Sequence, residues 1–89
     1  MAKQIIKELF ASEKIEVNAP VGSKVIMVAQ QKDRVGVWFE APSAIGIGKE
    51  LRIFKLFVTG AEVPRHAQHI GSVVGDDQMS NLVFHVYEV

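Results

Sequence analysis

Short runs in which apolar and polar residues alternate dominate the chain, and this period of two predicts β-strands. The clearest run is EKIEVNAP, in which Ile15 and Val17 lie on one face and polar side chains lie on the other. We expect this strand to stop at Pro20, because proline has no N–H to give to a ladder of hydrogen bonds. The first ten residues, MAKQIIKELF, also suit a short helix, and we favour a strand.

The other runs are apolar on both faces and are separated by residues typical of turns. KVIMVAQQ (24–31), the polar connector KDR and VGVWFE (35–40) predict a β-hairpin. In its second strand Val35, Val37 and Phe39 share one face, so Trp38 lies on the opposite face. Three further strands are predicted in LRIFKLFVTG (51–60), QHIGSVV (68–74) and LVFHVYEV (82–89).

Three segments between these runs are rich in turn-forming residues. Residues 41–50 contain Pro42, Gly46 and Gly48, and we expect them to form the longest irregular stretch. AEVPRHA and GDDQMSN predict a connection and a tight turn. Seven short strands without a long helix predict a single all-β domain over residues 1–89, a small antiparallel sandwich or barrel.

The predicted strands carry more apolar residues than one face of each strand would bury in a core. If the first side forms the core, the second side still carries Ile26, Val28, Trp38, Phe54, Val58, Val83 and Tyr87. Such a patch is larger than a soluble monomer usually exposes, and a homo-oligomer would bury it. Strand bends and bulges that let one core take both sets are an equally good alternative.

Composition narrows the classes of partner and the cellular setting. Basic and acidic residues number 10 each, so no net charge draws the chain to nucleic acid or to a membrane, and we expect neither as a partner. The chain has no cysteine, which excludes disulfides and thiolate metal sites and fits the cytoplasm. We also expect no signal peptide and no membrane span, because no window approaches about 20 apolar residues.

Catalytic and cofactor motifs are weak throughout. His66, His69 and His85 lack the spacing of a zinc site, and GIGKE lacks most of a phosphate-binding loop. No serine stands in a Gly-x-Ser-x-Gly elbow, and His85, between two apolar residues, fits a structural role. We therefore expect no catalytic residue, metal or cofactor, and a protein that is not an enzyme.

A ligand site is the better candidate. Trp38 offers a stacking surface, Arg52 shares a strand face with Phe54, and two further donors follow the Thr59-Gly60 corner. Arginine and an aromatic face together suit a planar anionic ligand such as a nucleotide. The candidate ligand-binding residues are Trp38, Arg52, Arg65 and His66. The alternative is that the cations lie at a sheet rim and Trp38 packs in a core or an interface.

The order of motifs APVGSKVIMVAQQ, VGVWFEAP, RIFKLFVTGAEVP, HIGSVV and LVFHVYE resembles a family of small bacteriophage and prophage proteins with no assigned activity. The matching positions are Pro20, Gly22, Gln31, Trp38, Thr59, Gly60, Gly71, His85 and Glu88. The resemblance implies a phage-encoded accessory protein in the cytoplasm of the bacterial host. We expect it to bind a host target; the alternatives are an oligomer that sequesters a small anionic signalling ligand, and a minor structural or assembly protein.

Overall fold

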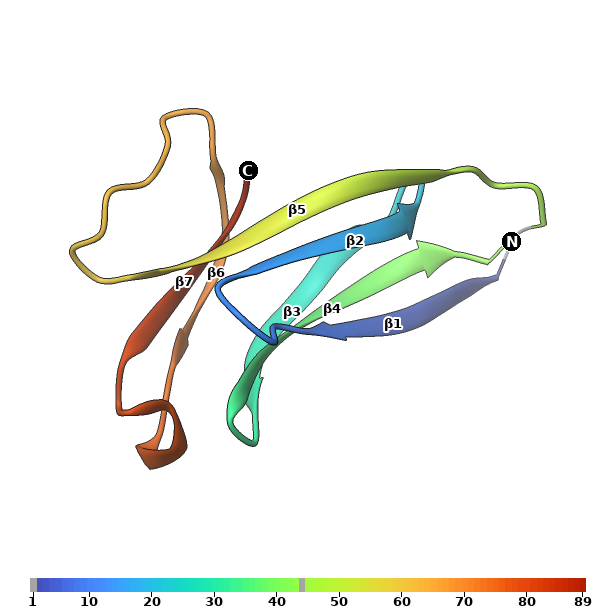
Figure 1. Ribbon diagram of the computed structural model, residues 1–89. Helices are drawn as coiled ribbons and strands as arrows, with labels where there is room; N and C mark the ends of the chain where they lie inside the picture. Colours follow the sequence, from blue (N-terminus) through green and yellow to red (C-terminus); the bar gives the residue numbers. More distant parts are fainter. Residues whose placement is uncertain (1, 44) are drawn as a thin grey trace.

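The computed structural model describes residues 2–43 and 45–89, which contain seven β-strands and one short 3-10 helix (Figure 1). The elements are β1 (Lys3–Leu9), β2 (Lys14–Pro20), β3 (Lys24–Gln31), β4 (Arg34–Pro42), β5 (Lys49–Val58), β6 (Gln68–Val74), η1 (Asp77–Met79) and β7 (Val83–Glu88). The strands form two antiparallel sheets, in the orders β1-β4-β3 and β2-β5-β7-β6. The prediction of an all-β fold with about seven strands is confirmed, and the two packed sheets form a sandwich.

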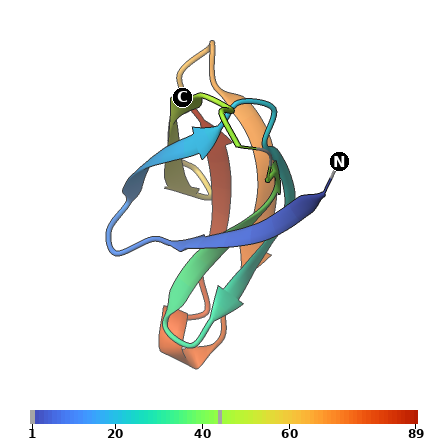
Figure 2. The same ribbon diagram turned by 90° about the vertical axis from the view of Figure 1, so that its right-hand side faces the viewer.

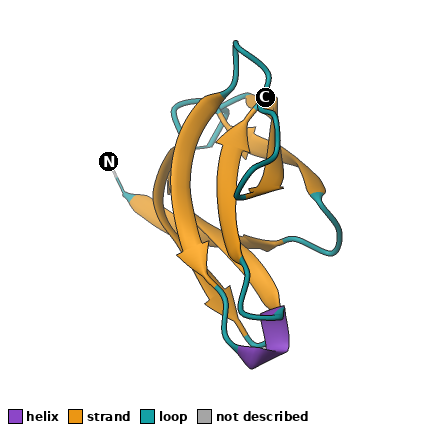
Figure 3. Cartoon of the chain, turned by 90° about the vertical axis from the view of Figure 1, so that its left-hand side faces the viewer, coloured by secondary structure: helices purple, strands orange, loops and turns teal. Residues whose placement is uncertain are grey.

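Most predicted strands lie where the alternating pattern placed them. The first segment is a strand, β3 and β4 form the predicted hairpin, and β2 ends at Pro20. The prediction for residues 41–50 was wrong in extent, because their first two and last two residues belong to β4 and β5. The longer irregular stretch is 59–67, the connection between β5 and β6, which is the yellow to orange loop of Figure 1 and one of the teal loops of Figure 3. Met1 and Ala44, which belong to two of the predicted segments, lie outside the described residues.

The core lies between the two sheets and is built from both inner faces. Phe39 of β4 and Phe54 of β5 meet edge to face, with ring centroids 5.5 Å apart, and both are fully buried. The buried cluster also contains Phe10, Val17, Ala19, Val35, Val37, Val73 and Val86. Edge-to-face packing of this kind stabilises a core beyond the area that it buries.

Three residues that we expected on the second side of their strands lie on the core side: Phe54, Val28 and Val58, which shares the face of Phe54 and lies opposite Phe84 at the end of β5, where it is 42% exposed. Phe54 is fully buried, and Val28 packs against the core. Val28 changes face because the pairing of β3 with β4 shifts between Val25 and Met27, and one extra residue reverses the alternation that follows it. Trp38, in contrast, lies opposite the core face of β4 as predicted.

The connection between β5 and β6 determines how the four-stranded sheet is assembled. β5 and β6 run parallel to each other on either side of β7. Val58 at the end of β5 is opposite Phe84, whereas Gln68 at the start of β6 is opposite Glu88. Residues 59–67 therefore carry the chain back along β7, which is why this connection is long.

The two sheets approach each other closely along β3 and β6 (Figure 2). The contact depends on Gly71, because a Cβ at this position would overlap Cγ2 of Val28. At the far end of β3, Gln30 forms two hydrogen bonds with Asp76, which follows β6. β1 and β2 are the edge strands on the opposite side of the sandwich.

Candidate binding surfaces

The four predicted ligand-binding residues lie in three different places. Trp38 is on the outer face of the three-stranded sheet, and Arg52 points from β5 into the space between the sheets. Arg65 and His66 are exposed on the connection 59–67. The fold thus brings only Arg65 and His66 together, and these two are neighbours in the sequence.

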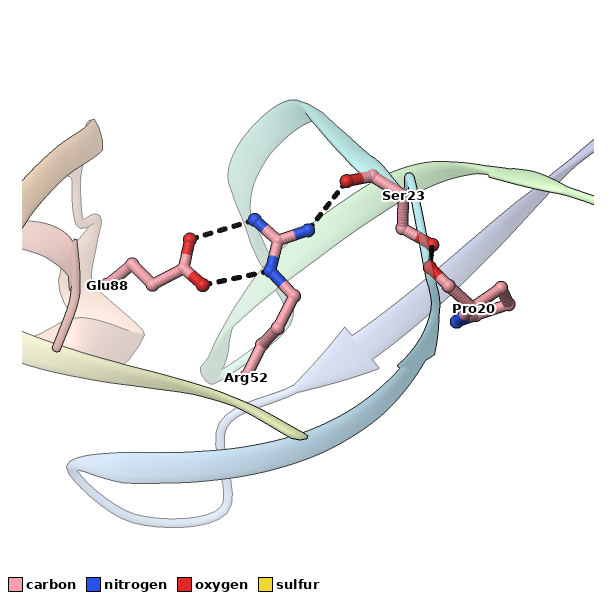
Figure 4. Close-up of polar contacts among 4 residues, drawn as sticks. All are labelled: Pro20, Ser23, Arg52 and Glu88. Carbon is pink, nitrogen blue, oxygen red and sulfur yellow. Dashed lines mark hydrogen bonds and ion pairs between the residues drawn. The ribbon is translucent and has the colours of Figure 1, made fainter. Parts of the chain in front are cut away.

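Arg52 is engaged in a contact within the protein. Its Nε and one terminal nitrogen each donate to a carboxylate oxygen of Glu88 at 2.8 Å, and its other terminal nitrogen donates to the carbonyl oxygen of Ser23 at 2.6 Å (Figure 4). The hydrogen bond with Glu88 raises the pKa of Arg52. The guanidinium also lies 5.5 Å from the ring centroid of Phe54. These contacts give Arg52 a structural role that ties β5, β7 and the β2–β3 turn together.

A row of hydrogen-bonded side chains crosses the outer face of the four-stranded sheet. Ser72 Oγ lies 2.7 Å from His85 Nδ1 and 3.0 Å from His69 Nε2. The second ring nitrogen of His85 lies 3.0 Å from the hydroxyl of Thr59. Tyr87 supports the row, since its ring packs edge to face on His69 with centroids 5.2 Å apart.

A second irregularity of the strands produces this row. His69 and Ser72 are three residues apart, a spacing that places side chains on opposite faces of a regular strand. The pairing of β6 with β7 shifts between His69 and Gly71, and this shift returns both side chains to one face. We did not expect the row from the sequence, because an alternating pattern does not reveal where a bulge occurs.

The contact between Ser72 and His85 resembles the serine and histidine of a nucleophilic pair. The group beside the second ring nitrogen of His85, however, is the hydroxyl of Thr59. In serine hydrolases a carboxylate usually holds that position and stabilises the charged imidazole. Ser72 also stands on an exposed strand rather than at a sharp turn. Within residues 2–43 and 45–89, no three His, Cys, Asp or Glu side chains are grouped to hold a metal ion.

The outer face of the three-stranded sheet presents apolar side chains from all three strands. Pairing places Trp38 between Lys7 and Met27, and Gly36 between Leu9 and Ala29. Ile5 remains 67% exposed and Met27 46% exposed. We call this surface the tryptophan face, formed by Ile5, Leu9, Met27, Ala29 and Trp38.

Charged residues at the rim of the tryptophan face are mostly basic. By register this side of the sheet carries Lys3, Lys7, Lys24, Arg34 and Glu40. It thus holds four of the ten basic residues of the chain and one of the ten acidic residues. Lys3 pairs with Glu40 at 3.0 Å, and Lys7 donates to the side-chain oxygen of Gln31 at 2.7 Å. The face is therefore apolar at its centre and positive at its rim, although the whole chain is neutral.

The fold and this surface define an all-β sandwich with an apolar, positively rimmed sheet face. The chain matches over residues 1–89 the family described as Domain of unknown function (DUF7352), and it belongs to that family. No curated protein and no solved structure matches the chain. In the described part of the chain, helices with the length and apolar character of a membrane span are absent.

Proposed function

We propose that this protein is a non-enzymatic binding protein whose tryptophan face docks on a partner protein. The observation that carries the proposal is the exposure of Ile5 and Met27 beside Trp38 on one sheet face. Large apolar side chains around a tryptophan are typical of the centre of a protein interface, where a few residues supply most of the binding energy.

The rim of the face defines the chemistry of the partner. Lysines and an arginine surround the apolar centre with a single carboxylate among them, so the best partner presents an apolar patch bordered by Asp and Glu side chains. Charges at a rim speed association and are screened by salt. Binding should therefore weaken as the ionic strength rises.

The resemblance to bacteriophage and prophage proteins supplies the setting for this proposal. In that setting the protein is phage-encoded, acts in the cytoplasm of the bacterial host and occludes a surface of a host protein. Sequestration of a small anionic ligand is less well supported, because Arg52 already donates to Glu88 and Ser23. Trp38 keeps its proposed role in binding, as part of a protein-docking face.

Affinity capture from a bacterial lysate, quantified by mass spectrometry, tests the proposal with matched variants. Met27→Glu places a carboxylate in the centre of the face, and Val74→Glu places one on an apolar site of the other sheet that is more exposed, 78% against 46%. We expect a protein retained by the wild type and by Val74→Glu to fall at least about tenfold with Met27→Glu, a loss of about 1.4 kcal/mol. Equal retention by the two folded variants, or no retained protein, would contradict the proposal.

A further inference from the structure

The edge of the three-stranded sheet formed by β1 is long and regular. β1 pairs with β4 over seven consecutive residue pairs without a register shift. The N–H of Phe10 donates to the carbonyl of Val35, and the N–H of Ser43 donates to the carbonyl of Ala2. Because bonding alternates along an antiparallel strand, the backbone groups of the even-numbered residues point to β4. Those of Lys3, Ile5, Lys7 and Leu9 point away from it.

The side chains that would normally protect this edge are directed elsewhere. Edge strands often carry lysines that keep other strands from pairing with them. In β1 both lysines reach back across their own sheet, Lys3 to Glu40 on β4 and Lys7 to Gln31 on β3. Both lysines are thus drawn away from the outward backbone groups of β1, and Glu8, on the opposite face of the strand, is its remaining charged residue.

We infer that two copies of this chain pair antiparallel through β1, which joins their three-stranded sheets into one six-stranded sheet. In such a dimer a two-fold axis runs perpendicular to the joined sheet. Residues opposite each other have their side chains on the same face, so the axis lies between one residue and its own copy, and this residue is the centre of the pairing. Three centres near the middle of the strand are possible: Ile5, Ile6 and Lys7. The distribution of charge along the strand distinguishes them.

Only the pairing centred on Ile6 avoids opposing like charges. A centre at Ile5 would place Lys3 opposite Lys7, and a centre at Lys7 would place that lysine opposite its own copy. With the centre at Ile6, lysines face Leu9 and Ile5 of the other copy, and Gln4 faces Glu8. This register also uses the outward groups of all four odd-numbered residues of β1.

The pairing changes the surface described above, and in this respect the inference deepens the proposed function. Ile5 and Leu9 lie on the tryptophan face next to the paired edge, so the faces of the two copies become one surface. A partner would then be bound by two adjacent faces, which raises the apparent affinity without new kinds of contact. The pairing itself does not require that any partner exists.

The oligomeric state, measured by light scattering after size-exclusion chromatography over a range of concentrations, tests the pairing. We expect the wild-type chain of 9.8 kDa to reach twice this mass as its concentration rises. Ile5→Pro removes one outward N–H without removing a bond to β4, and we expect it to shift the dimer to monomer. Ile5→Thr keeps the N–H and should remain dimeric. A wild type that stays monomeric, or a folded Ile5→Pro that stays dimeric, would overturn the inference.

Disulfide cross-linking tests the register of the β1–β1 pairing and does not depend on the proline variant. The chain has no cysteine, so in a variant with a single cysteine at position 5, 6 or 7 any disulfide joins that cysteine to its own copy in the second chain. In the inferred register the two copies of Ile6 face each other as a non-hydrogen-bonded pair, with Cα atoms about 4.5 Å apart, within the range of a disulfide. We expect Ile6→Cys to cross-link under mild oxidation, and Ile5→Cys and Lys7→Cys to remain mostly uncrosslinked. Equal cross-linking of all three, or of none, would contradict the register.

The two proposals fail in different ways. Met27 lies on β3, away from the paired edge, so Met27→Glu should lose the partner and keep the dimer. Ile5→Pro should lose the dimer and retain a weakened capture of the partner. A dimer without any captured protein would support the pairing and contradict the docking function.

Discussion

The indole of Trp38 lies over Gly36, two residues earlier on the same face of β4. A Cβ added at Gly36 would lie 2.7 Å from Cζ3 of that ring and 3.0 Å from Cδ2 of Leu9. The absence of a side chain at position 36 thus lets the ring pack against its own strand at this glycine. A ring held in this way loses little conformational entropy when a partner covers it.

Gly36→Ala should displace this ring and weaken both the fold and the docking surface. Because the ring or Leu9 must move to make room, we expect a loss of about 1–3 kcal/mol in the free energy of unfolding. Trp38 is the single tryptophan, so its fluorescence reports the displacement directly. Gly48→Ala is the control, since an added Cβ there meets nothing within 4 Å. An unchanged emission spectrum in Gly36→Ala would show that the ring does not depend on this glycine.

Loss of the Arg52 side chain should destabilise the sandwich far more than loss of a surface ion pair. Arg52→Ala leaves the Glu88 carboxylate and the Ser23 carbonyl without their donor, and the paired side chains are only 16% and 24% exposed. We expect a cost of about 2–3 kcal/mol in urea unfolding.

An exposed ion pair provides the comparison for this measurement. Lys3→Ala breaks the ion pair between Lys3 and Glu40, whose side chains are 68% and 38% exposed. Its loss should lower the free energy of unfolding by at most about 1 kcal/mol. Equal losses for Arg52→Ala and Lys3→Ala would contradict the structural role of Arg52. Arg52→Lys should recover only part of the stability, because an ammonium cannot bind both carboxylate oxygens in the same fork.

The contact between Gln30 and Asp76 should make stability depend on pH on the acid side. The Gln30 side chain, followed by the backbone N–H groups of Gln78 and Met79, lowers the pKa of Asp76. A lowered pKa in the folded state contributes stability above the pKa of the unfolded chain, and this stability is lost as the pH falls through the folded value.

Thermal unfolding measured from neutral to acidic pH tests this contribution. Gln30→Leu should raise the pKa of Asp76 and flatten the acid part of the profile, and Asp76→Asn should flatten it as well because the group no longer titrates. The pKa of the Asp76 carboxyl can be followed by NMR in the wild type and in Gln30→Leu. An identical pKa in both proteins would show that the amide does not hold the carboxylate.

The strands were predictable because each carries a local signal. Alternation located β2 and the core face of β4, and Pro20 ended β2 where a ladder bond would be lost. The opposite placement of Trp38 follows from the same period of two. These features depend only on residues close together in the sequence, so one chain is enough to find them.

Features that depend on distant residues were not predictable. Arg52 looked like a ligand group because its partner Glu88 is 36 residues away. Val28 and Ser72 could not be assigned to the correct faces, because both follow irregularities in strand pairing that no local pattern marks. The row of hydrogen-bonded side chains on the four-stranded sheet needs two distant features. One is the shift in the pairing of β6 with β7, and the other is the connection 59–67, which carries the chain back along β7.

The strand order β2-β5-β7-β6 also has a consequence for the way the chain folds as it is made. β7 leaves the ribosome after both of its neighbours, yet it is the strand that joins them. Until it arrives, β6 has no hydrogen-bonded neighbour in its sheet, and β5 has only β2. The hairpin of β3 and β4 can form early, but the second layer must wait for the last strand. Such non-local pairing is slow and leaves edges open to other chains during synthesis.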